Sequence, residues 1–142
     1  MAEESTTSDL VAIARRGNEA ASRRDIDGMM SIWGSEPVWD LSPMGLGAYE
    51  GVAAIRGFFE DWLGSYDEFE MGEEELVDLG GGVTFGVFVQ RGRPTGSSGE
   101  VTIRYGSVGV WDAGNLVRVT QYSDIDEARA AAERLAQERA DG

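Results

Sequence analysis

The 142-residue chain contains no cysteine and no histidine. Without cysteine it can form no disulfide, thiolate nucleophile or sulfur-ligated metal site. Without histidine it lacks the usual acid–base group near neutral pH and the commonest protein metal ligand. Zinc and non-haem iron sites are therefore not expected, whereas a magnesium or calcium site built from oxygens stays open. Any chemistry would use carboxylates, tyrosine, other polar groups or the backbone, and we expect no cofactor.

Positive charge and long apolar runs are also scarce. Twelve basic residues face 26 acidic ones, for a net charge of -14, which argues against binding to nucleic acid. No apolar run approaches the ~18 residues of a membrane span, and the acidic start does not resemble a signal peptide. We therefore expect a cytoplasmic protein that binds no membrane. The length and the 42% apolar content predict one domain over residues 1–142, with frayed ends at 1–7 and 138–142.

Apolar residues recur at helical spacing in the first half of the chain. A first helix is expected to begin near a Ser8 cap and to run to about Arg24, and a shorter helix follows Asp25 and ends at Gly34. After an apolar strand that ends at Asp40, a third helix carries an apolar stripe made of Val52, Ile55, Phe58, Phe59, Trp62 and Leu63. This stripe predicts a helix that covers a sheet.

From Tyr66 onward the pattern changes to period two with glycine-rich turns. Strands are expected around 69–79, 83–89, 101–111 and 116–122, with a hairpin loop over 91–99. Sequential strands joined by turns predict a bent antiparallel sheet. Asp124 and Glu127 have capping-box spacing and open a final helix. The order of elements predicts an α+β fold.

The charged residues of the strands have structural interpretations. Arg104 and Arg118 are expected to form ion pairs across a sheet or a dimer interface. Arg91 and Arg93 in the hairpin are expected to be solvated, and the run of glutamates at 73–75 predicts a solvated sheet edge.

Several segments, in this order, resemble the SnoaL-like and ketosteroid-isomerase-like branch of the nuclear transport factor 2-like superfamily. They are residues 25–30 (DIDGMM), the Trp39-Asp40 strand, 49–59 (YEGVAAIRGFF) and 115–124 (NLVRVTQYSD). The resemblance implies a cystatin-like cone, in which a curved antiparallel sheet wraps around a long helix and leaves an apolar pocket. It also implies a small hydrophobic molecule as ligand, and a homodimer through the outer sheet face.

Asp40 is the candidate catalytic base. It lies at the end of an apolar strand, where burial among apolar neighbours would raise the pKa of its carboxyl. The resemblance implies the same role, because Asp40 matches the position at which ketosteroid isomerases keep the Asp that moves a proton between substrate carbons. The alternative is an Asx-turn over Asp-Leu-Ser-Pro, in which the carboxylate accepts backbone hydrogen bonds and its pKa is lowered.

The resemblance leaves the rest of a catalytic set incomplete. Gly17 and Ser107 stand where ketosteroid isomerases carry a Tyr and a neutral carboxylic acid, and Gln121 stands where limonene-epoxide hydrolases carry an Asp that activates water. Glycine has no side-chain donor and an amide does not titrate. Tyr105 shares a strand face with Ser107, so the candidate polar partners of Asp40 are Tyr105, Ser107 and Gln121.

The expected pocket wall consists of large apolar residues, which a buried core would explain equally well without a ligand. These residues are Trp33, Trp39, Phe59, Trp62, Ile103 and Val119.

Two functions remain open. In the first, a cofactor-independent enzyme takes a small hydrophobic substrate, Asp40 moves a proton, and the polar partners hold an oxygen of the substrate. In the second, a non-catalytic ligand-binding or assembly module keeps the cone without the catalytic set. A buried Asp40 with a raised pKa would favour the first, whereas an Asx-turn with a lowered pKa would favour the second.

Overall fold

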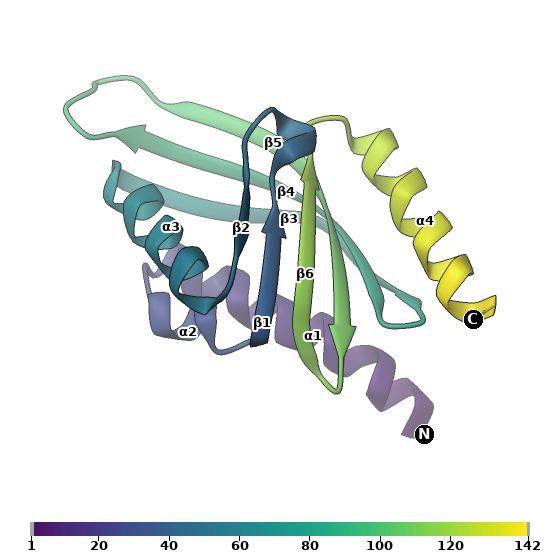
Figure 1. Ribbon diagram of the computed structural model, residues 1–142. Coiled ribbons are helices and arrows are strands. Elements are labelled where there is room, and N and C mark those ends of the chain that lie inside the picture. The colour runs from purple at the N-terminus through teal and green to yellow at the C-terminus, as the bar shows by residue number, and fades with distance from the viewer. Residues whose placement is uncertain (1, 142) are drawn as a thin grey trace.

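The computed structural model describes residues 2–141, with side chains from Asp9 onward (Figure 1). Its helices are α1 (Ala2–Ser22), α2 (Ile26–Met30), the 3₁₀ turn η1 (Ser42–Met44), α3 (Val52–Gly64) and α4 (Ile125–Asp141). Its strands are β1 (Trp33–Asp40), β2 (Ala48–Glu50), β3 (Tyr66–Gly80), β4 (Val83–Pro94), β5 (Val101–Asp112) and β6 (Asn115–Tyr122). The α+β prediction is confirmed.

The strands form one curved, unclosed sheet in the order β2-β1-β6-β5-β4-β3. The four sequential strands β3 to β6 pair antiparallel, as the turns predict. Two strands at the other end of the sheet extend it beyond the four predicted from period two. β1 pairs in parallel with β6, with Trp39 opposite Val119, and β2 pairs antiparallel with β1. With only three residues, β2 is too short to show an alternating pattern.

Helices α1, α2 and α3 cover the concave face of this sheet and α4 covers part of the outer face (Figure 1). The concave-side core joins Ala20 and Ala21 of α1 to Phe59 and Leu63 of α3 and to Trp39 of β1. This arrangement confirms the cone that wraps a sheet around helices. Among the described residues, no helix combines the length and the apolarity that a bilayer span requires.

On the outer face, α4 packs closely against the sheet because the helix and the strands both present small residues where they meet. Ala128, Ala132 and Ala136 are buried against β4, and Ala128 lies over Gly106 of β5. A Cβ atom added at Gly106 would come within 2.5 Å of the Ala128 Cβ, so glycine is what lets the helix approach. The backbone N–H of Glu127 donates to Asp124 Oδ1 at 3.0 Å, which confirms the predicted cap.

The two terminal helices are longer than expected. Helix α1 begins at Ala2 instead of near Ser8, and α4 runs to Asp141, so helix occupies most of the segments expected to be frayed. Met1 and Gly142 lie outside the described residues.

The glutamate run at 73–75 is not a simple solvated edge. A register shift in β3 between Glu73 and Glu75 interrupts the alternation of the strand, so these two carboxylates, two residues apart, lie on opposite faces of the sheet. Each glutamate of the run meets an arginine of a different element, and the closest N–O distances are 2.7 Å for Glu73–Arg15, 2.8 Å for Glu74–Arg104 and 2.8 Å for Glu75–Arg129. The run therefore links β3 to α1 on one face and to β5 and α4 on the other.

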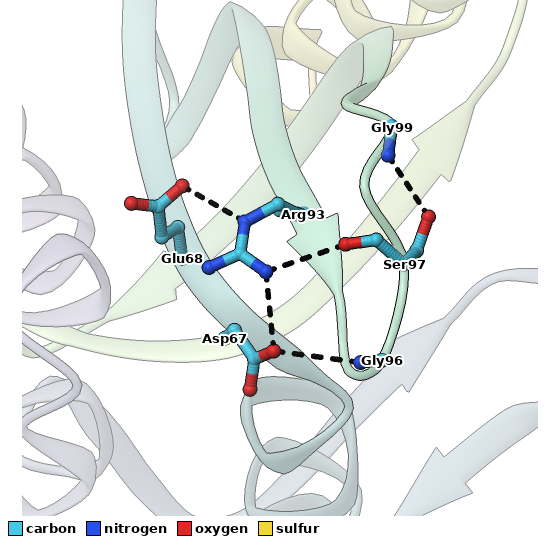
Figure 2. A network of polar contacts seen from close by, with 6 residues as sticks. All are labelled: Asp67, Glu68, Arg93, Gly96, Ser97 and Gly99. Carbon is cyan, nitrogen blue, oxygen red and sulfur yellow. Dashed lines mark hydrogen bonds and ion pairs between the residues drawn. The ribbon is translucent and has the colours of Figure 1, made fainter.

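The β4–β5 hairpin loop is also held by an arginine that the sequence led us to expect in solvent. Figure 2 shows Arg93 donating to Glu68 at 3.1 Å, to Asp67 at 3.3 Å and to the carbonyl of Ser97 at 3.3 Å. The backbone N–H of Gly96 also donates to Asp67, at 3.4 Å. Arg93 thus ties the loop to the start of β3.

Candidate functional site

A cavity of about 110 Å³ lies between the concave sheet face and helices α1 to α3. Of the expected wall residues, Trp33, Trp39, Phe59, Trp62 and Val119 line it, and Ile103 does not. Ile103 pairs with Gln90 in the part of β5 that is nearer the hairpin loop, and this part of the strand lies beyond the cavity. The fourth tryptophan, Trp111, also lines the cavity, and the wall therefore contains every tryptophan of the chain.

The three candidate polar partners are brought together in this cavity. Tyr105, Ser107 and Gln121 all line it. Ser107 of β5 lies directly opposite Gln121 of β6, and Tyr105 lies on the same face of β5 because side chains alternate along a strand. Among the described residues, neither the Ser107 hydroxyl nor the Gln121 amide has a side-chain hydrogen-bond partner within the protein. Both groups are therefore available to a ligand.

The Tyr105 hydroxyl is buried and holds a weak partner. The side chain is 4% exposed, and its hydroxyl donates to the Met71 sulfur at 3.3 Å. Burial raises the pKa of Tyr105, so the phenol remains protonated near neutral pH. Because a thioether is a weak acceptor, an oxygen acceptor would be a better partner for this hydroxyl.

A second buried donor lies in the cavity wall. The indole Nε1 of Trp39 is buried and has no hydrogen-bond partner among the described residues. The ring is fixed by aromatic neighbours, with its centroid 4.7 Å from that of Phe58 and 4.8 Å from that of Phe59. By contrast, the indole of Trp111 donates to Thr84 Oγ1 at 2.9 Å. An unpaired buried donor is rare and costs free energy, so the Trp39 indole N–H would gain from a hydrogen-bond acceptor.

Asp40 lies outside the cavity. Since Trp39 lines the cavity and side chains alternate along β1, the Asp40 carboxylate points to the opposite face of the sheet. Its Oδ1 accepts the backbone N–H of Ser42 at 2.9 Å, and its Oδ2 accepts from Arg118 at 2.9 Å. These bonds from Ser42, assisted by Arg118, lower the pKa of Asp40. The geometry is that of the Asx-turn, and it separates the candidate base from its three candidate polar partners.

Some of the residues that line the cavity were not predicted from the sequence. Asn18 comes from α1, Met71 from β3, and Thr84 and Phe88 from β4. Period two along β4 contained a signal for the last two, because residues 84, 86 and 88 share one strand face. Met71 carried no such signal, since a register shift interrupts β3 nearby.

Of the described side chains that line the cavity, none is charged; all are apolar, aromatic, glycine or neutral polar. Within the described part of the chain, no three acidic side chains gather closely enough to hold a metal ion. Gly17 also lines the cavity, and there it offers no side-chain donor. The site can therefore enclose a mainly apolar ligand, and its hydroxyl and amide groups can form hydrogen bonds with a polar atom of that ligand.

Comparisons with known proteins agree with this architecture. A family model described as a SnoaL-like domain matches residues 14–119. Among curated proteins, no similar sequence is found.

Three solved structures illustrate the shared fold. An NTF2-like protein of unknown function from Burkholderia pseudomallei K96243 is 19% identical, covers 87% of this chain and 97% of its own, and gives a TM-score of 0.70. A hypothetical protein with a ketosteroid isomerase-like fold from Catenulispora acidiphila DSM 44928, in complex with trimethylamine, is 10% identical, with coverages of 84% and 91% and a TM-score of 0.70. An LEH-like epoxide hydrolase from M. tuberculosis is 15% identical, with coverages of 91% and 92% and a TM-score of 0.71. At these identities the likeness concerns the fold alone.

Proposed function

Because the chain belongs to the SnoaL-like domain family, we propose that its cavity binds a small neutral molecule made of one apolar ring or chain and an acceptor oxygen. The observation that carries the proposal is the lining itself, which over the described residues is aromatic and apolar with a few neutral polar groups and no charged one. A charged ligand would lose its hydration there without gaining a counter-charge, at a large cost in free energy.

The size of the cavity limits the ligand. Its volume of about 110 Å³ is below the roughly 300–1,000 Å³ of pockets that hold drug-sized molecules. It is close to the ~150 Å³ of an engineered apolar cavity that binds benzene. The ligand that fits best is therefore of the size of one six-membered ring.

The polar groups favour an acceptor on that ligand. Within the described part of the chain, the Trp39 indole is a buried donor without a partner, and the Tyr105 hydroxyl donates to a sulfur. Ser107 and Gln121 add a hydroxyl and an amide on neighbouring strands, neither of them paired with another described side chain. A carbonyl, ether or similar oxygen would give these donors the stronger partner that the protein does not supply.

This proposal favours binding over acid–base catalysis. A general base must reach the proton that it removes, whereas Asp40 lies on the other face of β1 with its carboxylate paired to Arg118. The Tyr105 hydroxyl lies in the cavity, but burial raises its pKa further above neutral, so it is a donor and not a base near neutral pH. The cavity residues can orient a ligand without taking a proton from it.

A homodimer through the outer sheet face stays a prediction. Helix α4 occupies the part of that face formed by Val83, Phe85 and Val87. The remaining part carries the ion-paired Arg104 and Arg118, so a dimer interface there would be polar. Sedimentation velocity would test it, since a homodimer sediments as a species of twice the 15.3 kDa chain mass.

The binding proposal is tested by NMR titration of the tryptophan indole N–H resonances, because all four tryptophans line the cavity. With methylenecyclohexane as the probe, we expect saturable shifts of these resonances. Ala14→Phe should abolish the shifts, because Ala14 of α1 lines the cavity and a larger side chain would fill it. The matched control Ala130→Phe, on an exposed position of α4, should leave them unchanged. Equal shifts in the two variants would contradict binding in the cavity.

A further inference from the structure

Met71 forms part of the wall between the cavity and the solvent. A second hollow, here called the outer groove, lies between α1 and β3 and is lined by Arg15, Asn18, Glu19, Ser22, Arg23 and Glu73 together with Met71 and Gly72. Asn18 and Met71 line both the cavity and the outer groove. These two side chains therefore stand between the two spaces.

The backbone of Met71 makes two hydrogen bonds with Ser22, whereas its side chain makes one polar contact, through the sulfur. The Met71 N–H donates to the Ser22 hydroxyl at 3.0 Å, and that hydroxyl lies 3.4 Å from the Met71 carbonyl, to which it donates. Close by, Arg15 and Glu73 form a two-pronged ion pair across the same seam, with N–O distances of 3.0 and 2.7 Å. The methionine side chain itself is unbranched and flexible, and its polar contact is the sulfur that accepts from Tyr105.

We propose that Met71 is a movable plug of the cavity, and that its rotation towards the outer groove opens a path for the ligand and releases the Tyr105 hydroxyl to an acceptor oxygen on that ligand. The plug rests on the proposed function, because it adds the path and the hydrogen-bond partner to the same cavity. In the structure the Tyr105 hydroxyl donates to the thioether of Met71, which is a weak acceptor. In the complex an oxygen replaces it, so the ligand competes with a side chain of the protein for one hydrogen bond.

The competition predicts opposite effects for the two partners. Removing the Tyr105 hydroxyl removes the donor and weakens the binding of ligands that carry an oxygen. Removing the Met71 sulfur removes the internal competitor and increases the affinity for the same ligands. Ligands without an oxygen should respond to neither change, since they make no bond to the hydroxyl. A residue that only packs against the ligand would affect both kinds of ligand alike.

Cyclohexanone and methylenecyclohexane are suitable probes because they have nearly the same shape. They differ only in that the first carries a carbonyl oxygen where the second carries a methylene group. Dissociation constants are measured for both from the indole N–H resonances in wild type, Tyr105→Phe and Met71→Leu. For cyclohexanone we expect Tyr105→Phe to raise the dissociation constant about fivefold and Met71→Leu to lower it about threefold. For methylenecyclohexane we expect less than about a twofold change in either variant.

Matched controls are Tyr122→Phe and Met30→Leu, whose side chains do not line the cavity. Both should keep the wild-type constants. If both probes bind but the ratio of their constants is the same in wild type, Tyr105→Phe and Met71→Leu, the plug is wrong and the binding proposal stands. If neither probe binds the wild-type protein, the binding proposal and the proposed role of Met71 are both wrong.

Discussion

Arg118 donates a hydrogen bond of 2.9 Å to the carboxylate of Asp40, from β6 to β1 and on the face of the sheet turned away from the cavity. The candidate base is therefore an ion-paired turn residue. Its other oxygen accepts the backbone N–H of Ser42, two residues along the chain. Both contacts stabilise the charged form of the carboxyl and hold it outside the cavity.

Asp40→Asn should leave ligand binding unchanged. The amide keeps an oxygen for the Ser42 N–H but loses the ion pair with Arg118, so we expect a loss in the free energy of unfolding of about 0.5–1 kcal/mol. Chemical denaturation measures this loss, and probe titration measures binding. A tenfold weaker affinity for methylenecyclohexane would show that Asp40 acts in the cavity after all.

Acid should destabilise the fold through Asp40 and Glu75. The pKa of Asp40 is lowered by Ser42 and then Arg118, and the pKa of Glu75 is lowered by its hydrogen bonds from Arg129. A lowered pKa in the folded state means that the unfolded chain binds protons first as the pH falls. The stability from these groups is therefore complete above their unfolded pKa values of about 4 and is lost below them.

The measurement is the urea midpoint between pH 7 and pH 3. We expect a steep fall below about pH 4, and a shallower fall in Glu75→Gln, because that variant has already lost the titrating group. Parallel profiles for the variant and the wild type would contradict a role for the Glu75–Arg129 pair in acid sensitivity.

Two glycine substitutions should change stability in opposite directions. Gly106→Ala places a Cβ atom within 2.5 Å of Ala128, so α4 must shift, at a cost of about 1–3 kcal/mol. Gly57→Ala lies inside α3 with nothing within 4 Å of the new Cβ, and the higher helix propensity of alanine should stabilise the protein by about 0.5–1 kcal/mol. Thermal unfolding of the two variants checks both signs, and destabilisation by Gly57→Ala would contradict the packing described for α3.

The fold was largely predictable because the periodic patterns are local. The stripe of α3 and the period-two strands from β3 to β6 need only neighbouring residues, and the Asp124 cap needs a spacing of three. The parallel pairing of β1 with β6 joins residues far apart, with Val38 opposite Arg118, and no local pattern encodes it. Nor does composition reveal which arginine meets which glutamate of the 73–75 run.

The site was predictable where alternation applies. The shared face of Tyr105 and Ser107 follows from period two, and both residues line the cavity. The position of Asp40 was harder, because the same rule that puts Trp39 inward puts its neighbour outward, and the sequence does not say which of the two faces the cavity. Met71 could not be found, since its importance lies in a sulfur that meets the Tyr105 hydroxyl from another strand.

We expect the cavity to bind neutral molecules of about one ring and to reject charged ones. The most direct test titrates the wild-type protein with cyclohexanone and, under the same conditions at pH 7, with cyclohexanecarboxylate and cyclohexylammonium, while the four indole N–H resonances are followed. We expect saturable shifts with the ketone and at least tenfold weaker binding of both ions, because the described lining residues offer no counter-charge. Binding of either ion as tight as that of the ketone would contradict this expectation.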